Sequence, residues 1–208
     1  MFKFLLASAL LCVSFVNTAG LGNSGRTNLD VYYESLCPDS RAFLVNQLAP
    51  QWKSLSSFVN LRLIPFGKAS FSQNSSGGWS FKCQHGSAEC TGNILHACGI
   101  KYSKDNTQAL NYASCLMRAP TSGAQCAELA GLDFTPIDTC TKTSEGQELA
   151  VAHGTETLTL QPTLTFVPWV VYDKVFDDGK QWSSLSNLRS VACNHNGFNA
   201  PSCLSNVL

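Results

Sequence analysis

The ten cysteines of this chain constrain its fold more than any other feature of the sequence. Six of them lie within residues 83–140. In a cytosolic protein such a cluster would favour metal binding or catalysis, whereas in an exported protein it favours a framework of disulfides. The interpretation therefore depends on whether the chain is exported.

The first 19 residues have the pattern of a secretory signal peptide. Lys3 provides a positive start, and the apolar stretch 4–16 is too short to span a bilayer. Small residues follow, so we expect cleavage after Ala19 and a mature domain of residues 20–208. A buried N-terminal helix is the alternative. The chain is predicted to be secreted, with delivery to lysosomes as the other destination.

Removal of the signal peptide takes away Cys12 and leaves nine cysteines, which is an odd number. If eight of them pair, the sequence alone allows about 105 pairings and leaves one thiol free or joined to another molecule. If all the others form structural disulfides, Cys37 is the one left over. The eight cysteines expected in disulfides are Cys83, Cys90, Cys98, Cys115, Cys126, Cys140, Cys193 and Cys203.

Composition and charge narrow the choice of partners. The chain has 208 residues, 44% of them hydrophobic, which suffices for one domain with a sizeable core. The formal net charge is zero and no basic or acidic run stands out, so nucleic acid and membranes are poor candidates. The sequon that begins at Asn74, in a Gly/Ser-rich segment expected to be an exposed loop, predicts a glycan.

The order of predicted elements indicates an α/β fold. Residues 28–36 and 58–67 read as strands, separated by a helix that starts after Cys37 and that Pro50 is expected to kink or end. A strand–helix–strand unit favours parallel pairing with a right-handed crossover. Short helices are expected throughout residues 83–140.

Further along the chain, residues 143–158 read as a helix with Thr143 or Ser144 as its cap. Residues 164–176 have strand character, and the DDGK sequence after them predicts a tight turn between two strands. A last helix is expected at 185–195. This order is that of a thioredoxin-like fold with a disulfide-rich helical insertion at about 83–140.

Cys37 lies where the first strand meets the first helix, which is a reactive location for a thiol. Free N–H groups and the helix dipole stabilise a thiolate there. Redox enzymes often place a second cysteine three positions later to resolve the mixed disulfide, but that position is Ser40, whose hydroxyl forms no disulfide. Pro168, inside a strand-like segment, is either the cis-proline that accompanies such thiols or an edge-strand proline.

The segment 83–98, CQHGSAECTGNILHAC, resembles the signature of gamma-interferon-inducible lysosomal thiol reductases. The preceding residues 64–82 and the FVPWV segment around Pro168 are similar to that family too, and the likeness covers about residues 28–193. The resemblance implies a thioredoxin-like fold with a helical insertion, secretion or lysosomal delivery, and reduction of protein disulfides at acidic pH through a C-x-x-C pair. Cys37 matches the nucleophile of the family, whereas Ser40 stands where its resolving cysteine is expected.

Other chemistries are weaker interpretations. Zinc could be bound by Cys83, His85, Cys90 and Cys98, but their spacing is not that of common zinc sites and export favours disulfides, so we expect no metal and no cofactor. His85 and Glu89 are more simply structural. His96, His153 and His195 carry no signal above ordinary histidines, and no motif for a serine hydrolase is present.

Three functions remain. The first is a protein that has lost reductase turnover because of Ser40 and acts by binding other proteins, whose identity the sequence does not give. The second is a single-thiol disulfide reductase or isomerase, in which Cys37 attacks and an external thiol resolves. The third is a dimer linked through Cys37, in place of a monomer.

Overall fold

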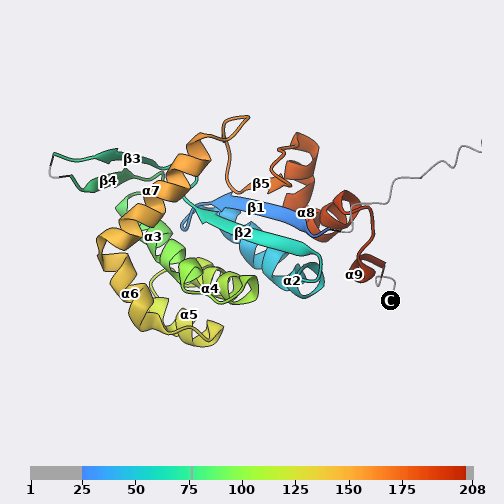
Figure 1. The fold of residues 1–208 in the computed structure, drawn as a ribbon, viewed down its shortest axis with the longest axis horizontal. Coiled ribbons are helices and arrows are strands. Elements are labelled where there is room, and N and C mark those ends of the chain that lie inside the picture. Colours follow the sequence, from blue (N-terminus) through green and yellow to red (C-terminus); the bar gives the residue numbers. More distant parts are fainter. Residues whose placement is uncertain (1–24, 76, 205–208) are drawn as a thin grey trace, which may run out of the picture.

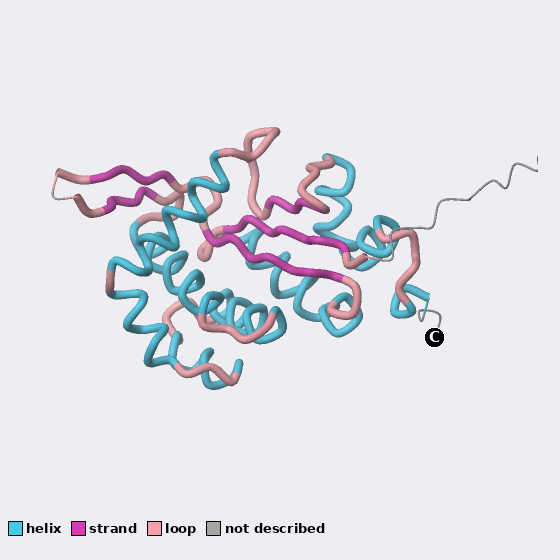
Figure 2. The backbone as a smooth tube through the Cα atoms, viewed as in Figure 1, coloured by secondary structure: helices cyan, strands magenta, loops and turns pink. Residues whose placement is uncertain are grey.

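The computed structural model describes residues 25–75 and 77–204, so the predicted signal peptide lies outside the described residues. Its centre is a three-stranded sheet of order β2-β1-β5 (Figures 1 and 2). Strand β1 (Thr27–Tyr33) pairs in parallel with β2 (Val59–Pro65) and antiparallel with β5 (Trp169–Tyr172). The parallel pair and its helical crossover are those predicted from the first 67 residues.

The crossover between β1 and β2 is one long helical segment. It consists of α1 (Pro38–Phe43), a π turn η1 (Leu44–Leu48) and α2 (Ala49–Leu55). The N–H of Ala49 donates to the carbonyl of Leu44, five residues back, just before Pro50, which has no N–H to donate. The helix therefore passes through Pro50 with a local change of pitch and does not end there.

Side chains that alternate along β1 are divided between two cores, as expected for a central strand. Leu29, Val31 and Tyr33 are fully buried against the crossover helix and parts of the later helices. Tyr32 faces the other way and packs with Trp169 of β5. Cys37 follows this buried strand after the short connection of residues 34–36, which leads into the crossover helix.

The chain between β2 and β5 forms a hairpin and a group of helices. The helices are α3 (Ser87–Lys101), α4 (Asn106–Arg118), α5 (Gly123–Ala130), α6 (Phe134–Lys142) and α7 (Ser144–Leu158). Thr143 occupies the N-cap of α7, but its hydroxyl donates back to the carbonyl of Cys140 in the last turn of α6 and makes no capping bond to α7. In Figure 1 these helices lie beside the sheet, and α7 runs back toward β5.

The expected Gly/Ser-rich loop is a β-hairpin. Strands β3 (Ser70–Gln73) and β4 (Trp79–Lys82) pair antiparallel and extend away from the rest of the molecule (Figure 1). The aromatic side chains that stabilise it include Phe71, whose ring lies 5.5 Å from that of Trp79. Asn74 is exposed at its turn, where its side-chain oxygen accepts a hydrogen bond from the N–H of Gly78.

Four disulfides join the eight cysteines expected to pair. They are Cys83–Cys90, Cys98–Cys140, Cys115–Cys126 and Cys193–Cys203. The middle two lie in a core of their own, built by the insertion helices around buried side chains such as Leu116 and Ile137. The insertion is thus held by apolar packing and covalent links together.

The C-terminal segment differs from the expectation. Within the part of the chain that the structure describes, a single bridge, Tyr172 to Val175, follows β5, because the turn comes earlier, at Asp173 and Lys174, which both have positive φ. The DDGK sequence is no strand turn: Asp177 accepts a hydrogen bond from the N–H of Lys180 and caps a helix. That helix, α8 (Asp178–His195), precedes the short α9 (Pro201–Leu204), and no helix within 25–204 is long and apolar enough to cross a membrane.

Candidate functional site

Cys37 is the N-cap residue of α1 and the one cysteine of the described chain that is not in a disulfide. Its backbone is held on both sides, since its N–H donates to the carbonyl of Glu34 and its carbonyl accepts from Arg41. The side chain is buried, at 6% exposure. Its thiol lies 3.8 Å from the carbonyl oxygen of Val167, so the thiol faces the segment that carries Pro168.

The peptide bond between Val167 and Pro168 is cis. This segment is secured by a residue that sequence reasoning missed, the fully buried Gln181 of α8. The Gln181 amide donates to the carbonyl of Pro168 at 2.8 Å and accepts from the N–H of Val170 at 2.7 Å. No motif marked Gln181, because its partners are backbone groups that only the fold brings close.

Ser40 lies one turn into the helix and is completely buried. Its hydroxyl oxygen accepts a hydrogen bond from the N–H of Glu34 at 3.3 Å. Position 40 therefore links the helix to the end of β1, and this link needs an acceptor but no sulfur. Because the other described cysteines are all in disulfides, no second thiol is present to resolve a mixed disulfide at Cys37.

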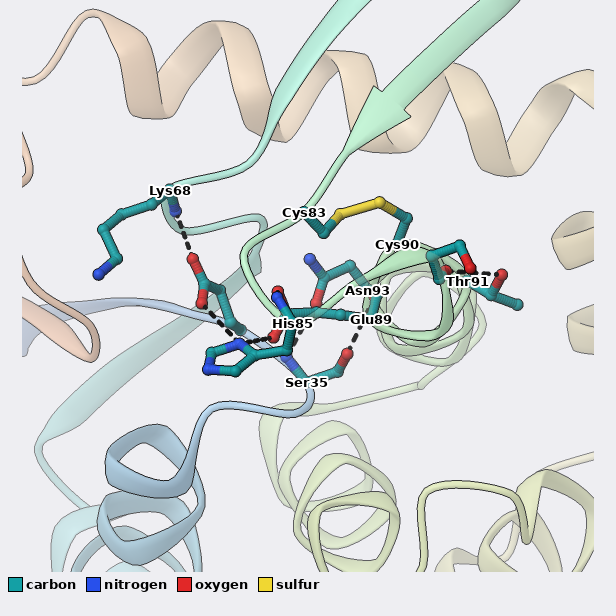
Figure 3. Close-up of a disulfide and its surroundings, with 10 residues drawn as sticks. Ser35, Lys68, Cys83, His85, Glu89, Cys90, Thr91 and Asn93 are labelled. Carbon is teal, nitrogen blue, oxygen red and sulfur yellow. Dashed lines mark hydrogen bonds and ion pairs between the residues drawn. A yellow bond between two sulfur atoms is a disulfide. The ribbon is translucent and has the colours of Figure 1, made fainter.

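Residues of the 83–98 signature support the turn that leads to Cys37. Asn93 accepts a hydrogen bond from the N–H of Ser35 at 2.8 Å, and the Ser35 hydroxyl donates to the carbonyl of Glu89 at 3.1 Å. Figure 3 shows these side chains below the Cys83–Cys90 disulfide, with His85 beside Glu89. The signature therefore folds against the thiol site.

The other histidines singled out in the sequence make their contacts with residues other than Cys37. His96 is buried against the hydroxyl of Tyr33, and burial lowers its pKa to about 3. Burial also lowers the pKa of His153 to about 4. His195 pairs with Asp173 near the C-terminus. None of these three has a recorded contact with the thiol.

The zinc alternative based on cysteine loses its ligands in this structure. Cys83 is bonded to Cys90, and Cys98 to Cys140, so three of the four suggested groups are no longer thiolates. His85 instead lies near two carboxylates, those of Glu34 and Glu89. Burial raises the pKa of Glu34, an effect that the hydrogen bond from the Lys68 N–H opposes and the nearby charge of Glu89 increases.

A free thiol at a strand–helix junction, opposite a cis-proline, defines the class: a thioredoxin-like thiol protein. Comparison with solved structures agrees on the fold, since Chlamydia trachomatis DsbA superposes with a TM-score of 0.58 at 11% identity, over 85% of this chain and 90% of that one. The predicted α/β, thioredoxin-like fold with a disulfide-rich helical insertion is confirmed.

The sequence comparisons give the family. Residues 28–130 match the family model of gamma interferon inducible lysosomal thiol reductase (GILT). A GILT-like protein of Anopheles gambiae is 35% identical, over 96% of this chain and 89% of its own length. The thiol reductase of Mus musculus is 30% identical over 86% of this chain and 72% of its own. The chain belongs to the GILT family, as its signature predicted.

Proposed function

We propose that this protein is a secreted member of the GILT family that has lost two-thiol reductase turnover and acts by binding other proteins. The observation that carries the proposal is Ser40, which holds the position of a resolving cysteine with a buried hydroxyl. Without a second thiol, a mixed disulfide at Cys37 has no internal route to release. Four disulfides fit an oxidising, extracellular compartment and support the secreted location.

The surface beside the thiol supports a binding role. The ring of Phe166, directly before the cis-proline segment, lies 5.1 Å from that of Trp182, which is 50% exposed. Exposed aromatic side chains are enriched among residues that dominate protein interfaces. A partner docking along the Val167–Pro168 segment would therefore meet apolar surface next to the segment that covers the buried thiol.

The test is reduction of a protein disulfide substrate at acidic and at neutral pH, with the native protein, Ser40→Cys and Ser40→Ala in parallel. We expect the native protein and Ser40→Ala to be inactive and Ser40→Cys to gain turnover, because only that change supplies the resolving thiol. Ser40→Ala controls for loss of the hydrogen bond to Glu34. Turnover by the native protein at a rate close to that of Ser40→Cys would refute the proposal.

A single-thiol enzyme is the second candidate, and the free thiol of Cys37 beside the Val167 carbonyl favours it. The Cys37 thiolate would attack a substrate disulfide, form a mixed disulfide and release one substrate thiolate. An external thiol would then attack the Cys37 sulfur, releasing the second substrate thiolate, and another external thiol would regenerate Cys37. This candidate requires native turnover that rises with external thiol and disappears in Cys37→Ser. Electrophoresis without reductant tests the Cys37-linked dimer on the same samples.

A further inference from the structure

Two buried carboxylates face one imidazole at the base of the thiol site. Glu34 follows the end of β1, Glu89 lies in the first turn of α3, and His85 precedes that helix. The Nδ1 atom of His85 lies 2.6 Å from Oε2 of Glu89 and 3.5 Å from Oε2 of Glu34. Both glutamate side chains are fully buried, whereas that of His85 is 32% exposed.

The two carboxylates do not have enough donors. Oε1 of Glu34 accepts from the N–H of Lys68 at 2.6 Å, and Oε1 of Glu89 accepts from the N–H of His85 at 3.0 Å. Within the described chain, Oε2 of Glu34 is buried with no hydrogen-bond partner, and its ion-pair contact is the imidazole nitrogen that already serves Glu89. A buried carboxylate anion without a donor at one oxygen is strongly disfavoured, so either a proton or a cation at this atom would stabilise the site.

The chemistry of these groups matches a divalent cation. Two carboxylates carry two negative charges, and the one imidazole beside them offsets at most one. One nitrogen and two oxygens are ligands that zinc accepts, with bonds of about 2.0–2.2 Å. The three atoms already lie within 4.8 Å of one another. An ion would take the place of the hydrogen bond between Nδ1 of His85 and Oε2 of Glu89, and the 32% exposure of the His85 side chain gives the ion access from solvent.

We propose that Glu34, His85 and Glu89 form a binding site for a divalent cation of the zinc type. The site differs from a cysteine-based zinc centre, because all its ligands are outside the disulfides. The site also adjoins the turn of residues 34–37 that leads to the thiol. The carbonyl of Glu34 accepts a hydrogen bond from the N–H of Cys37, and the N–H of Glu34 donates one to the hydroxyl of Ser40. Cation binding would therefore rigidify the turn that presents Cys37, independently of any reductase activity.

The probe is zinc chloride, titrated calorimetrically at neutral pH into the full mature protein after treatment with a chelator. We expect one ion per chain and a rise in melting temperature. Mutation of a residue that only supports a metal ligand typically lowers metal affinity by about 10–100-fold. His85→Asn and Glu34→Gln remove ligands themselves, so each should lower the zinc affinity by more than that. His85 is partly exposed, so His85→Asn keeps the test valid if Glu34→Gln does not fold.

Two matched variants separate this site from others. His195→Asn removes an imidazole that lies 2.7 Å from a carboxylate of Asp173, and Cys37→Ser removes the free thiol. Both should bind zinc as the native protein does and show the same rise in melting temperature. The proposal is overturned if the native protein binds no zinc, if His85→Asn binds as tightly as native, or if either control loses the site.

Discussion

His96 should make the folded protein less stable in acid. Its side chain is 2% exposed, and its recorded polar contact is the hydroxyl of Tyr33, 2.9 Å away. Burial lowers its pKa to about 3, whereas in the unfolded chain the pKa is near the ordinary histidine value of 6.5. Between these two values the unfolded chain binds a proton that the folded protein excludes, so acid favours unfolding.

The size of the effect follows from the two pKa values. Stability is complete above pH 6.5 and declines as the pH falls toward 3, by about 1.4 kcal/mol for each pH unit. At pH 5, His96 alone should therefore lower the free energy of unfolding by about 2 kcal/mol relative to pH 7.5. His153, whose pKa is lowered to about 4, acts in the same direction.

The assay is urea unfolding of the native protein and of His96→Gln at pH 7.5 and pH 5. Glutamine keeps a polar group near Tyr33 and does not titrate, so the variant should lose about 2 kcal/mol less between the two conditions. His153 is present in both proteins and cancels in the difference. Equal pH dependence in native protein and His96→Gln would contradict the reasoning.

Two further predictions concern the disulfides and the hairpin. The double variant Cys98→Ala/Cys140→Ala opens a link between residues 42 apart and should lower the free energy of unfolding by about 4 kcal/mol, because the longer loop gains more chain entropy on unfolding. Removal of the Cys193–Cys203 link, whose separation is 10, should lower it by about 3 kcal/mol. Urea unfolding that gives the opposite order would contradict this. Asn74→Gln should increase the electrophoretic mobility of protein secreted from a eukaryotic host, because exposed Asn74 is the proposed glycan site; an unchanged mobility would show that it carries none.

The parts of the fold that the sequence predicted are those with local signals. Alternation marked β1, and the proline after Cys37 marked the start of the helix. The hairpin β3–β4 was missed because Gly and Ser dominate its turn, whereas its stability comes from aromatic contacts across the strands, such as Phe71 with Trp79. The prediction of a strand turn at DDGK was wrong because aspartate is common both in turns and at helix N-caps. Here Asp177 is the N-cap of α8.

The site divides in the same way. Cys37, Ser40 and Pro168 were identified because each has a motif of its own. Gln181 and Glu34 were missed because their roles are contacts between segments distant in sequence, such as Glu34 with Lys68. A signal for Glu34 did exist, namely an acidic residue in an otherwise strand-like run just before the thiol, but its partner His85 lies 51 positions further along the chain.

The buried contacts around Cys37 bear on how family membership should be used. Gln181 holds the cis-proline segment, Asn93 holds the turn at Ser35, and the Ser40 hydroxyl holds the end of β1. Each contact satisfies a buried backbone group, so the fold requires it whether or not the thiol reacts. An intact scaffold is therefore no argument for turnover. The identity of the atom at position 40 does bear on two-thiol turnover, because only sulfur can form the second disulfide. Our proposal places the loss of two-thiol turnover at that one atom, which is why Ser40→Cys and Ser40→Ala differ in what they test.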